Sequence, residues 1–358
     1  MPSLKEIKGR INSISSTLAI TSAMKMVAAA KLQKAQMAIQ NMLPYERRLH
    51  SMLIDLMGAM NISAAASEDG SVRGSGSAER GFDQSGDRLS LSNRHDLAGM
   101  DGAYSLMAQR EVRKVAIVAF ASNSSLCGAF NSNVIREATA VINEYRASGL
   151  GDADITVYSV GRKMAEAMRK LGFPSPADFT KMSDSPSYEA ASALAQELLD
   201  GFVSGRFDKV ELVYNHYKST SSQPTTRQTY LPLSLADATA DIQVGKITDS
   251  ASESDTNRGA EPVGAPVVRQ GSPTTEDLIV EPSKEALIAT LLPKVIRLRI
   301  FTTLLDSAAA EHAARTVAMQ LATDNGNDLL QELTLEYNKG RQQKITSEIL
   351  DLVGGSLQ

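Results

Sequence analysis

The stretch SLKEIKGRINSISSTLAITSAMKMVAAAKLQKAQMAIQNM, residues 3–42, decides the fold of this protein. Apolar residues recur along it at alternating spacings of three and four, and the ladder continues to residue 60. That spacing is typical of the seam of a coiled coil, which is narrower than the apolar stripe of a globular helix. We therefore expect one long helix over residues 1–62, beginning with the S-x-x-E capping box of Ser3 and Glu6.

Pro44 lies inside this ladder, and proline removes one backbone hydrogen bond and crowds the preceding turn. The helix should therefore kink or split there. The ladder positions are Leu4, Ile7, Ile11, Ile14, Leu18, Thr21, Lys25, Ala28, Leu32, Ala35, Ile39, Met42, Glu46, Leu49, Leu53, Leu56 and Met60.

A second long helix is expected over residues 281–358, capped by Ser283 and bent near Pro293. Its ladder is less regular, with a slip in phase between Ala313 and Gly326. Alanine runs in both helices allow close approach of two backbones, and the two ends must pair antiparallel if the middle folds as one unit. The apolar side is expected at Leu287, Leu291, Leu298, Leu305, Ala308, Leu330, Leu333, Tyr337, Ile345, Ile349 and Leu352.

The middle, residues 112–237, alternates strand and helix patterns, which predicts a small, mostly parallel, Rossmann-like α/β domain. The fold class is therefore α/β, with a long antiparallel coiled coil around that domain. Residues 63–111 and 238–280 are polar and aperiodic, the second segment also acidic, and both are expected to be flexible insertions. The expected strands are 114–120, 155–160, 209–214 and the edge strand 225–233, and the expected helices are 131–146, 162–171 and 187–204.

Catalytic signatures are missing from the sequence. It contains no G-x-x-x-x-G-K-[ST] loop and no G-x-G-x-x-G after the first strand, and its four histidines lack metal-ligand spacing. Cys127 is the single cysteine, so no intrachain disulfide is possible, and we expect it to pack at a strand-to-helix turn. We expect no catalytic, cofactor-binding or metal-binding residue and no membrane-spanning segment.

The first helix is basic within a protein of net charge −4. Residues 1–50 hold eight basic residues against two acidic ones. Such a face favours an acidic partner, although a solvated helix face would carry the same charges. Nucleic acid is disfavoured because no aromatic stacking residues accompany the basic ones.

Three groups of motifs resemble the ATP synthase gamma subunit family. They are ITSAMKMVAAAKL at 20–32, LCGAFN at 126–131, and a C-terminal group of AMQLATDNG at 318–326, YNKGRQ at 337–342 and ITSEI at 345–349. They occur in the family's order, and the resemblance covers everything except the two insertions. The family has Gly-Ala where this chain has Gly355-Ser356, and the single cysteine excludes the regulatory dithiol of plant chloroplast forms.

The resemblance implies a non-catalytic central-stalk rotor of a proton-translocating ATP synthase. Its paired helices would enter a ring of three alpha and three beta subunits, and its α/β domain would rest on the c-ring beside epsilon. The beta subunits would carry out the ATP chemistry while proton flow turns the shaft. The protein would be peripheral at the cytoplasmic face of a bacterial inner membrane, attached only through the c-ring.

The resemblance also implies partner contacts at six residues. Met24 and Lys25 match positions near the acidic lever of the beta subunits, and Arg341, Gln342, Thr346 and Glu348 match contacts with the catalytic ring. Ordinary coiled-coil surface or core is the alternative for each. Two other functions stay open from the residues alone: an α/β enzyme with a helical dimerisation stalk, and a coiled-coil adaptor.

Overall fold

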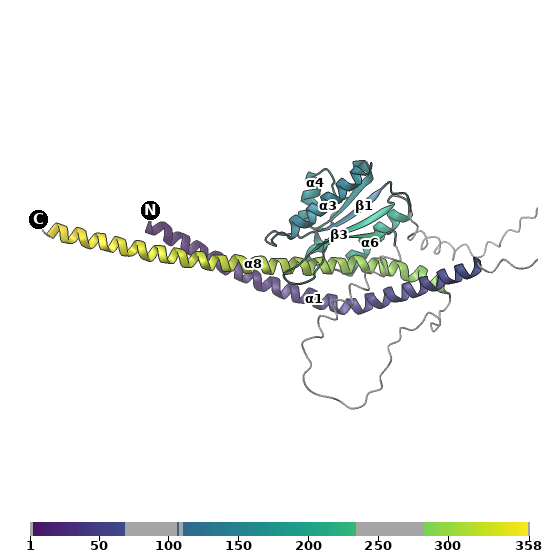
Figure 1. Ribbon diagram of the computed structural model, residues 1–358, viewed down its shortest axis with the longest axis horizontal. Helices are drawn as coiled ribbons and strands as arrows, with labels where there is room; N and C mark the ends of the chain where they lie inside the picture. The colour runs from purple at the N-terminus through teal and green to yellow at the C-terminus, as the bar shows by residue number, and fades with distance from the viewer. Residues whose placement is uncertain (1–2, 69–105, 107–109, 234–282, 357–358) are drawn as a thin grey trace, which may run out of the picture.

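Two long helices run side by side and carry a small α/β domain on one flank (Figure 1). The computed structural model describes residues 3–68, 106, 110–233 and 283–356. The elements in chain order are α1 (Leu4–Glu68), β1 (Val115–Phe120), α3 (Phe130–Ala147), η2 (Asp152–Asp154), β2 (Ile155–Val160), α4 (Arg162–Lys170), α5 (Thr180–Asp184), α6 (Tyr188–Val203), β3 (Lys209–Asn215), β4 (Thr225–Leu231) and α8 (Lys284–Ser356).

The antiparallel pairing of α1 and α8 is confirmed by contacts along their length. Glu46 accepts a hydrogen bond from Thr302 (3.0 Å), and Thr323 donates one to Thr21 (3.0 Å). Further along α1 toward its N-terminus, Leu18 lies against Gly326, where an added Cβ would approach its Cδ2 to 2.6 Å. All described positions of the predicted ladder on α1, from 4 to 56, are buried or half-buried. The seam was therefore predicted correctly.

The helix caps and prolines differ in how well they were predicted. The Ser3 hydroxyl accepts from the Glu6 amide (3.2 Å), and the Ser283 hydroxyl accepts from the Ala286 amide (3.1 Å), as expected. Neither Pro44 nor Pro293 splits its helix. The α1 helix also continues to residue 68, beyond the predicted end at 62, through an alanine-rich stretch of high helix propensity. The rest of the predicted insertions at 63–111 and 238–280 lies mostly outside the described residues.

The sheet has the strand order β2-β1-β3-β4, parallel except for the antiparallel edge strand β4. This confirms the small, mostly parallel domain. One face of the sheet packs against α3 and α4. The other face packs against α6 and the first part of α8, from Ile288 to Leu304. Leu49, Leu53 and Leu56 of α1 belong to the same core. None of the described helices is both long and apolar enough to cross a membrane.

A buried carboxylate fixes β4 and α3 to the centre of the sheet. Glu211 of β3 accepts hydrogen bonds from Tyr145 (2.6 Å) and Arg227 (2.7 Å) and pairs with Lys209 (2.6 Å). Burial alone would raise the pKa of Glu211, but these donors hold it below its ordinary value. The cluster is satisfied internally, so it has a structural role.

Gly161 allows β1 and β2 to end side by side. Its φ is +96°, and an added Cβ would lie 2.0 Å from the backbone oxygen of Ala121. Gly149 has nearly the same φ, +94°, but nothing lies within 4 Å of its added Cβ. A comparison of the two glycines therefore distinguishes the cost of a positive φ, which both share, from the cost of steric overlap, which only Gly161 has.

We predict that Gly161→Ala lowers the free energy of unfolding by about 3 kcal/mol or more, and that Gly149→Ala lowers it by only about 1 kcal/mol. Both variants incur the strain of a positive φ, but only the first forces a backbone contact apart. Chemical denaturation of the full chain measures the difference. Equal losses of unfolding free energy in the two variants would show that the close contact between Ala121 and Gly161 does not destabilise Gly161→Ala.

Candidate functional site

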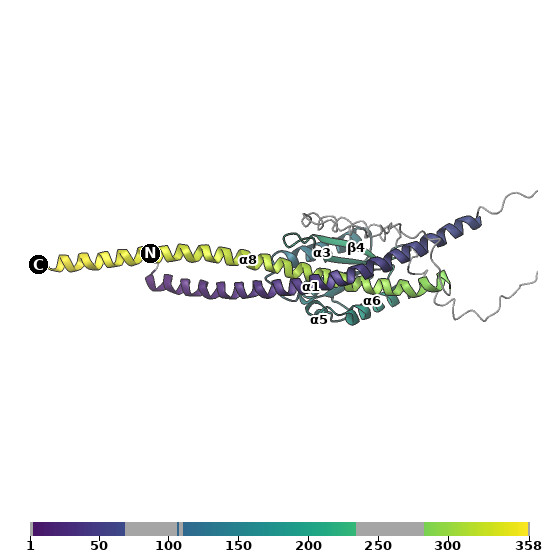
Figure 2. The ribbon, with the colours of Figure 1, turned by 90° about the horizontal axis from the view of Figure 1, so that it is seen from below.

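The C-terminal end of α8 extends beyond the N-terminus of α1 (Figures 1 and 2). Gly340 lies against Leu4, to whose Cδ2 an added Cβ would come within 3.1 Å. Residues 341–350 are all exposed. We call residues 341–356 the overhang, and at 1.5 Å per residue it is roughly 24 Å of single helix.

Part of the apolar side predicted for α8 was wrong, because its last three positions do not pack against α1. Ile345, Ile349 and Leu352 are exposed by 47%, 54% and 74%, although the ladder predicts that they face a partner helix. The reason is that α1 has already ended at this level. Leu350 and Val353 are exposed as well, so the overhang presents a concentration of apolar surface unusual for a protein that acts alone.

Four of the six predicted contact residues lie on the overhang. Arg341, Gln342, Thr346 and Glu348 are all exposed. The Thr346 hydroxyl donates to the Gln342 backbone oxygen (2.9 Å), and Glu348 lies 3.8 Å from Lys344, so their bonds are within their own helix. These side chains are accessible to a partner.

The other two, Met24 and Lys25, lie elsewhere on the shaft. Both are half-buried on α1, one turn beyond Thr21, which contacts Thr323. That level is about 30 Å from the start of the overhang, so the structure places the six residues in two separate groups. Exposed apolar side chains missed by the sequence analysis lie at the same level: Ile20, Met26 and Val27 on α1 and Leu321 on α8.

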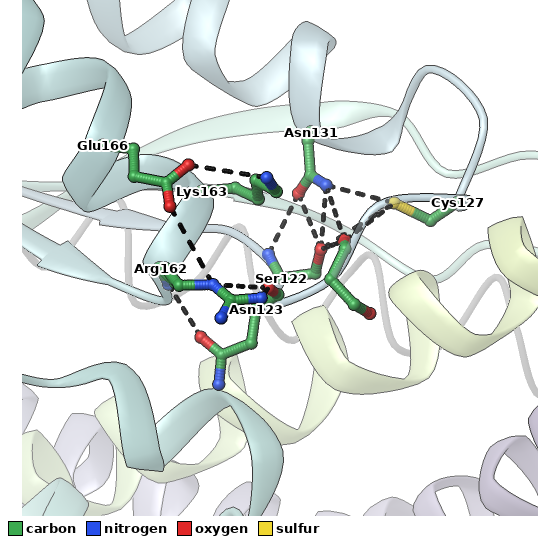
Figure 3. Close-up of polar contacts among 8 residues, drawn as sticks. Ser122, Asn123, Cys127, Asn131, Arg162, Lys163 and Glu166 are labelled. Carbon is green, nitrogen blue, oxygen red and sulfur yellow. Dashed lines mark hydrogen bonds and ion pairs between the residues drawn. The ribbon is translucent and has the colours of Figure 1, made fainter.

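The turn after β1 is held by a network of polar contacts (Figure 3). The Asn131 side-chain oxygen accepts from the Ser122 amide (3.0 Å), and its nitrogen contacts the Cys127 sulfur (3.2 Å). Asn123 accepts from the Arg162 amide (2.7 Å), which joins this turn to the start of α4. Cys127 is buried, as expected for a packed residue.

Helix α8 covers the place where a doubly wound enzyme binds its ligand, the carboxyl ends of the parallel strands. Arg315 donates to the Ser124 hydroxyl (2.7 Å), and an added Cβ on Gly128 would lie 3.9 Å from Ala318. Between the ends of β1 and β2 and α8 lies a cavity of about 10 Å³, enough for about one water. Across the described residues, no cluster of His, Cys, Asp and Glu is placed to hold a metal ion.

A buried ion pair lies at this junction. Arg315 donates to Glu311 (2.7 Å), and both side chains are about nine-tenths covered. Burial raises the pKa of Glu311 despite the opposing charge of Arg315. Burial, followed by the charges of Arg315 and Lys31, lowers the pKa of His312 to about 4, so its imidazole is neutral at pH 7.

The connection between β3 and β4 is attached to both long helices. Asp306 of α8 pairs with His216 Nδ1 (2.6 Å) and accepts from the Tyr217 amide (2.8 Å). Gln36 of α1 donates to the Tyr217 hydroxyl (2.7 Å). The hydrogen bond with Asp306 raises the pKa of His216 above its ordinary value, although burial and Lys218 oppose this. We call Asp306, His216, Tyr217 and Gln36 the clasp.

Comparisons with known proteins agree on one family. The ATP synthase family model matches residues 3–357. The chain is 46% identical to the ATP synthase gamma chain of Phocaeicola vulgatus and 45% identical to that of Bacteroides thetaiotaomicron, over the full length of each. A chain in the structure of Euglena gracilis mitochondrial ATP synthase, containing OSCP, F1 and the c-ring, has a similar fold, with a TM-score of 0.51 and 18% identity. That alignment covers 98% of this chain and 92% of the other.

We predict that the contribution of His216 to stability is present at low pH and is lost as the pH rises. A raised folded pKa means that the contribution is complete below the unfolded value of 6.5 and disappears as the pH passes through the folded value. The measurement is the free energy of unfolding against pH for the wild type minus that for His216→Gln. A difference that stays flat or grows with pH would contradict the ion pair. His312 does not interfere, because its pKa of about 4 lies below the pH range in which His216 titrates.

Proposed function

Because this chain belongs to the ATP synthase gamma chain family, we propose that it is the central-stalk rotor of a proton-translocating ATP synthase. In this role it transmits rotation of the c-ring to the catalytic ring of three alpha and three beta subunits. The chain contributes no catalytic group, and ATP is made in the beta subunits. Its function is mechanical, which fits a molecule built around two long paired helices.

The overhang is the observation that carries this proposal. A single helix with Ile345, Ile349 and Leu352 exposed gains stability when a partner covers those side chains, at about 25 cal/mol per Å² of buried apolar area. A ring of subunits that encloses the helix covers all of its faces at once. Arg341, Gln342, Thr346 and Glu348 would then provide polar contacts inside that ring.

The level of Met24 and Lys25 would form a second contact with the ring. The exposed apolar side chains Ile20, Met26 and Val27 lie beside a cationic side chain there, on a helix segment with excess positive charge. An acidic lever with an apolar flank complements such a surface. We assign the beta subunits to this contact because their acidic lever is what the family resemblance implies.

The α/β domain and the part of the paired helices beside it would bind the c-ring and epsilon. The domain lies on one flank of the shaft, so it turns as an arm when the shaft rotates (Figure 1). The protein would then be peripheral at the cytoplasmic face of a bacterial inner membrane, held there only through the c-ring. This location follows from the assembly and requires no membrane-spanning segment in this chain.

One alternative function is disfavoured by a specific observation. An α/β enzyme with a dimerisation stalk needs an open site at the carboxyl ends of its strands. In the described residues, α8 covers that position: Arg315 and Ala318 contact the turn after β1. The cavity between the strand ends and Leu304–Glu311 of α8 is only about 10 Å³. The other alternative, a coiled-coil adaptor without a rotary role, would not restore ATP hydrolysis when mixed with alpha and beta subunits.

We predict that the purified chain hydrolyses no ATP and that it forms a complex with alpha and beta subunits in which hydrolysis is restored. The chain would enter the complex at one copy for three of each partner. Size-exclusion chromatography and an ATPase assay on the same fractions test this. ATP hydrolysis by the chain alone, or failure to bind alpha and beta subunits, would contradict the proposal.

We predict that Ile349→Asp weakens binding to the alpha and beta subunits by at least about ten-fold, because it places a charge where an apolar contact forms. The control is Val203→Asp on the α/β domain, since Val203 is exposed by 50% and Ile349 by 54%. Neither change should alter the stability of the free chain. Equal affinities of the two variants would show that the overhang does not enter the ring.

A further inference from the structure

We propose that Asp306 is a positioning residue through which the α/β domain transmits torque to both long helices. This inference rests on the proposed rotor function, since it concerns how rotation crosses from the domain to the shaft. It assigns that task to the clasp at a particular level of α8. The three hydrogen bonds of the clasp and the limits of the hydrophobic core support it.

The main hydrophobic core between the domain and α8 ends at the level of the clasp, two residues before Asp306. It includes Ile296, Leu298, Ile300 and Leu304 of α8, and Leu304 is its last member on that helix. Beyond Leu304, Leu305 and Met319 are also buried on α8, but the two clusters against which Tyr217 packs contain only small buried side chains from this helix. These buried residues are Ala309, Ala310 and Ala313.

Alanines allow close approach, but their single methyl groups insert only shallowly into the opposing surface. They therefore provide less resistance to sliding than interlocked large side chains. Polar contacts with fixed directions supply the resistance that these side chains lack. Two such contacts occur on α8 beyond the core, one at Asp306 and one at Arg315.

Asp306 holds two consecutive residues of the domain with one carboxylate. Its two oxygens bind the His216 ring nitrogen at 2.6 Å and the Tyr217 amide at 2.8 Å. Both bonds are short, and the carboxylate is charged, which makes them stronger and more directional than neutral hydrogen bonds. The Asp306 side chain is only 18% exposed, so solvent screens the pair weakly.

Tyr217 extends the clasp from α8 to α1. It packs against two small clusters of buried residues, one that includes Leu32 of α1 and Ala309 of α8 and one that includes Cys127 and Ala310. Its hydroxyl accepts from Gln36, 2.7 Å away. A rotation of the domain about α8 therefore stretches bonds to both helices, and the pair turns with the domain as one body.

The experiment compares Asp306→Ala with the matched control Asp324→Asn in complexes with alpha and beta subunits. Asp324 is an exposed carboxylate on the same helix, bonded only to Gln320 one turn away. A probe is attached to the α/β domain through Ser148→Cys, an exposed position directly after the C-terminal end of α3. The measured quantity is the variance of the probe's angle while the alpha and beta subunits are fixed to a surface.

We expect Asp306→Ala to increase this variance by about 1.3-fold, because one of four polar attachments of the domain to α8 is lost while those at Tyr230, Gln196 and Ser124 remain. Asp324→Asn should leave it unchanged. Exchange of the Tyr217 amide hydrogen in the isolated chain should become faster in Asp306→Ala, which reports loss of the contact itself. Tyr217→Phe, which keeps the ring and the amide but loses the bond to Gln36, should give an intermediate variance.

An unchanged variance in Asp306→Ala, with faster exchange at Tyr217, would overturn the inference, because the contact would be lost without mechanical effect. An equal increase in Asp324→Asn would also overturn it. If Asp306→Ala does not fold, Asp306→Asn and Tyr217→Phe provide the same comparison. Failure of the wild-type chain to bind alpha and beta subunits would instead refute the proposed rotor function.

Discussion

The antiparallel packing of α1 on α8 is the constraint on which the rest of the structure depends. It joins segments from opposite ends of the chain, from the contact of Glu46 with Thr302 to that of Leu4 with Gly340. This pairing gives each helix the apolar partner that its ladder requires. It also determines where the pair ends, because α8 continues after α1 has stopped. The overhang exists because Leu4, at the start of α1, pairs with Gly340, and α8 continues past that pair to Ser356.

The packing also explains how an α/β domain whose strand ends are covered by α8 fits the function. In this domain the carboxyl ends of the strands, where related architectures bind ligands, are used to attach α8. Arg315 and Ser124 make that attachment, and the clasp adds a second one at Asp306. Charged side chains are costly to bury unless they are paired, and each of these charges has a partner. The domain is thus joined to the shaft by directional contacts as well as by a hydrophobic core.

Much of this could be predicted from the sequence because the signals are local. The spacing of apolar residues fixed the seam of α1, and Ser3 and Ser283 marked the helix starts. The strands followed from short buried runs with turn residues between them. The exposure of Ile349 could not be predicted, since a ladder does not show where the partner helix ends. The roles of Asp306 and Arg315 were also missed, because both depend on contacts with residues about 90 and 190 positions away.

Hydrogen exchange along α8 tests the central claim most directly, because it compares the paired part of the helix with the overhang in one experiment. In the free chain, amides of residues 341–353 should exchange quickly, since a short unpaired helix is marginally stable, whereas those of 304–320 should be protected. Binding of alpha and beta subunits should slow exchange in 341–353 by about 100-fold or more. Unchanged exchange in 341–353 while both partners remain bound would contradict the account.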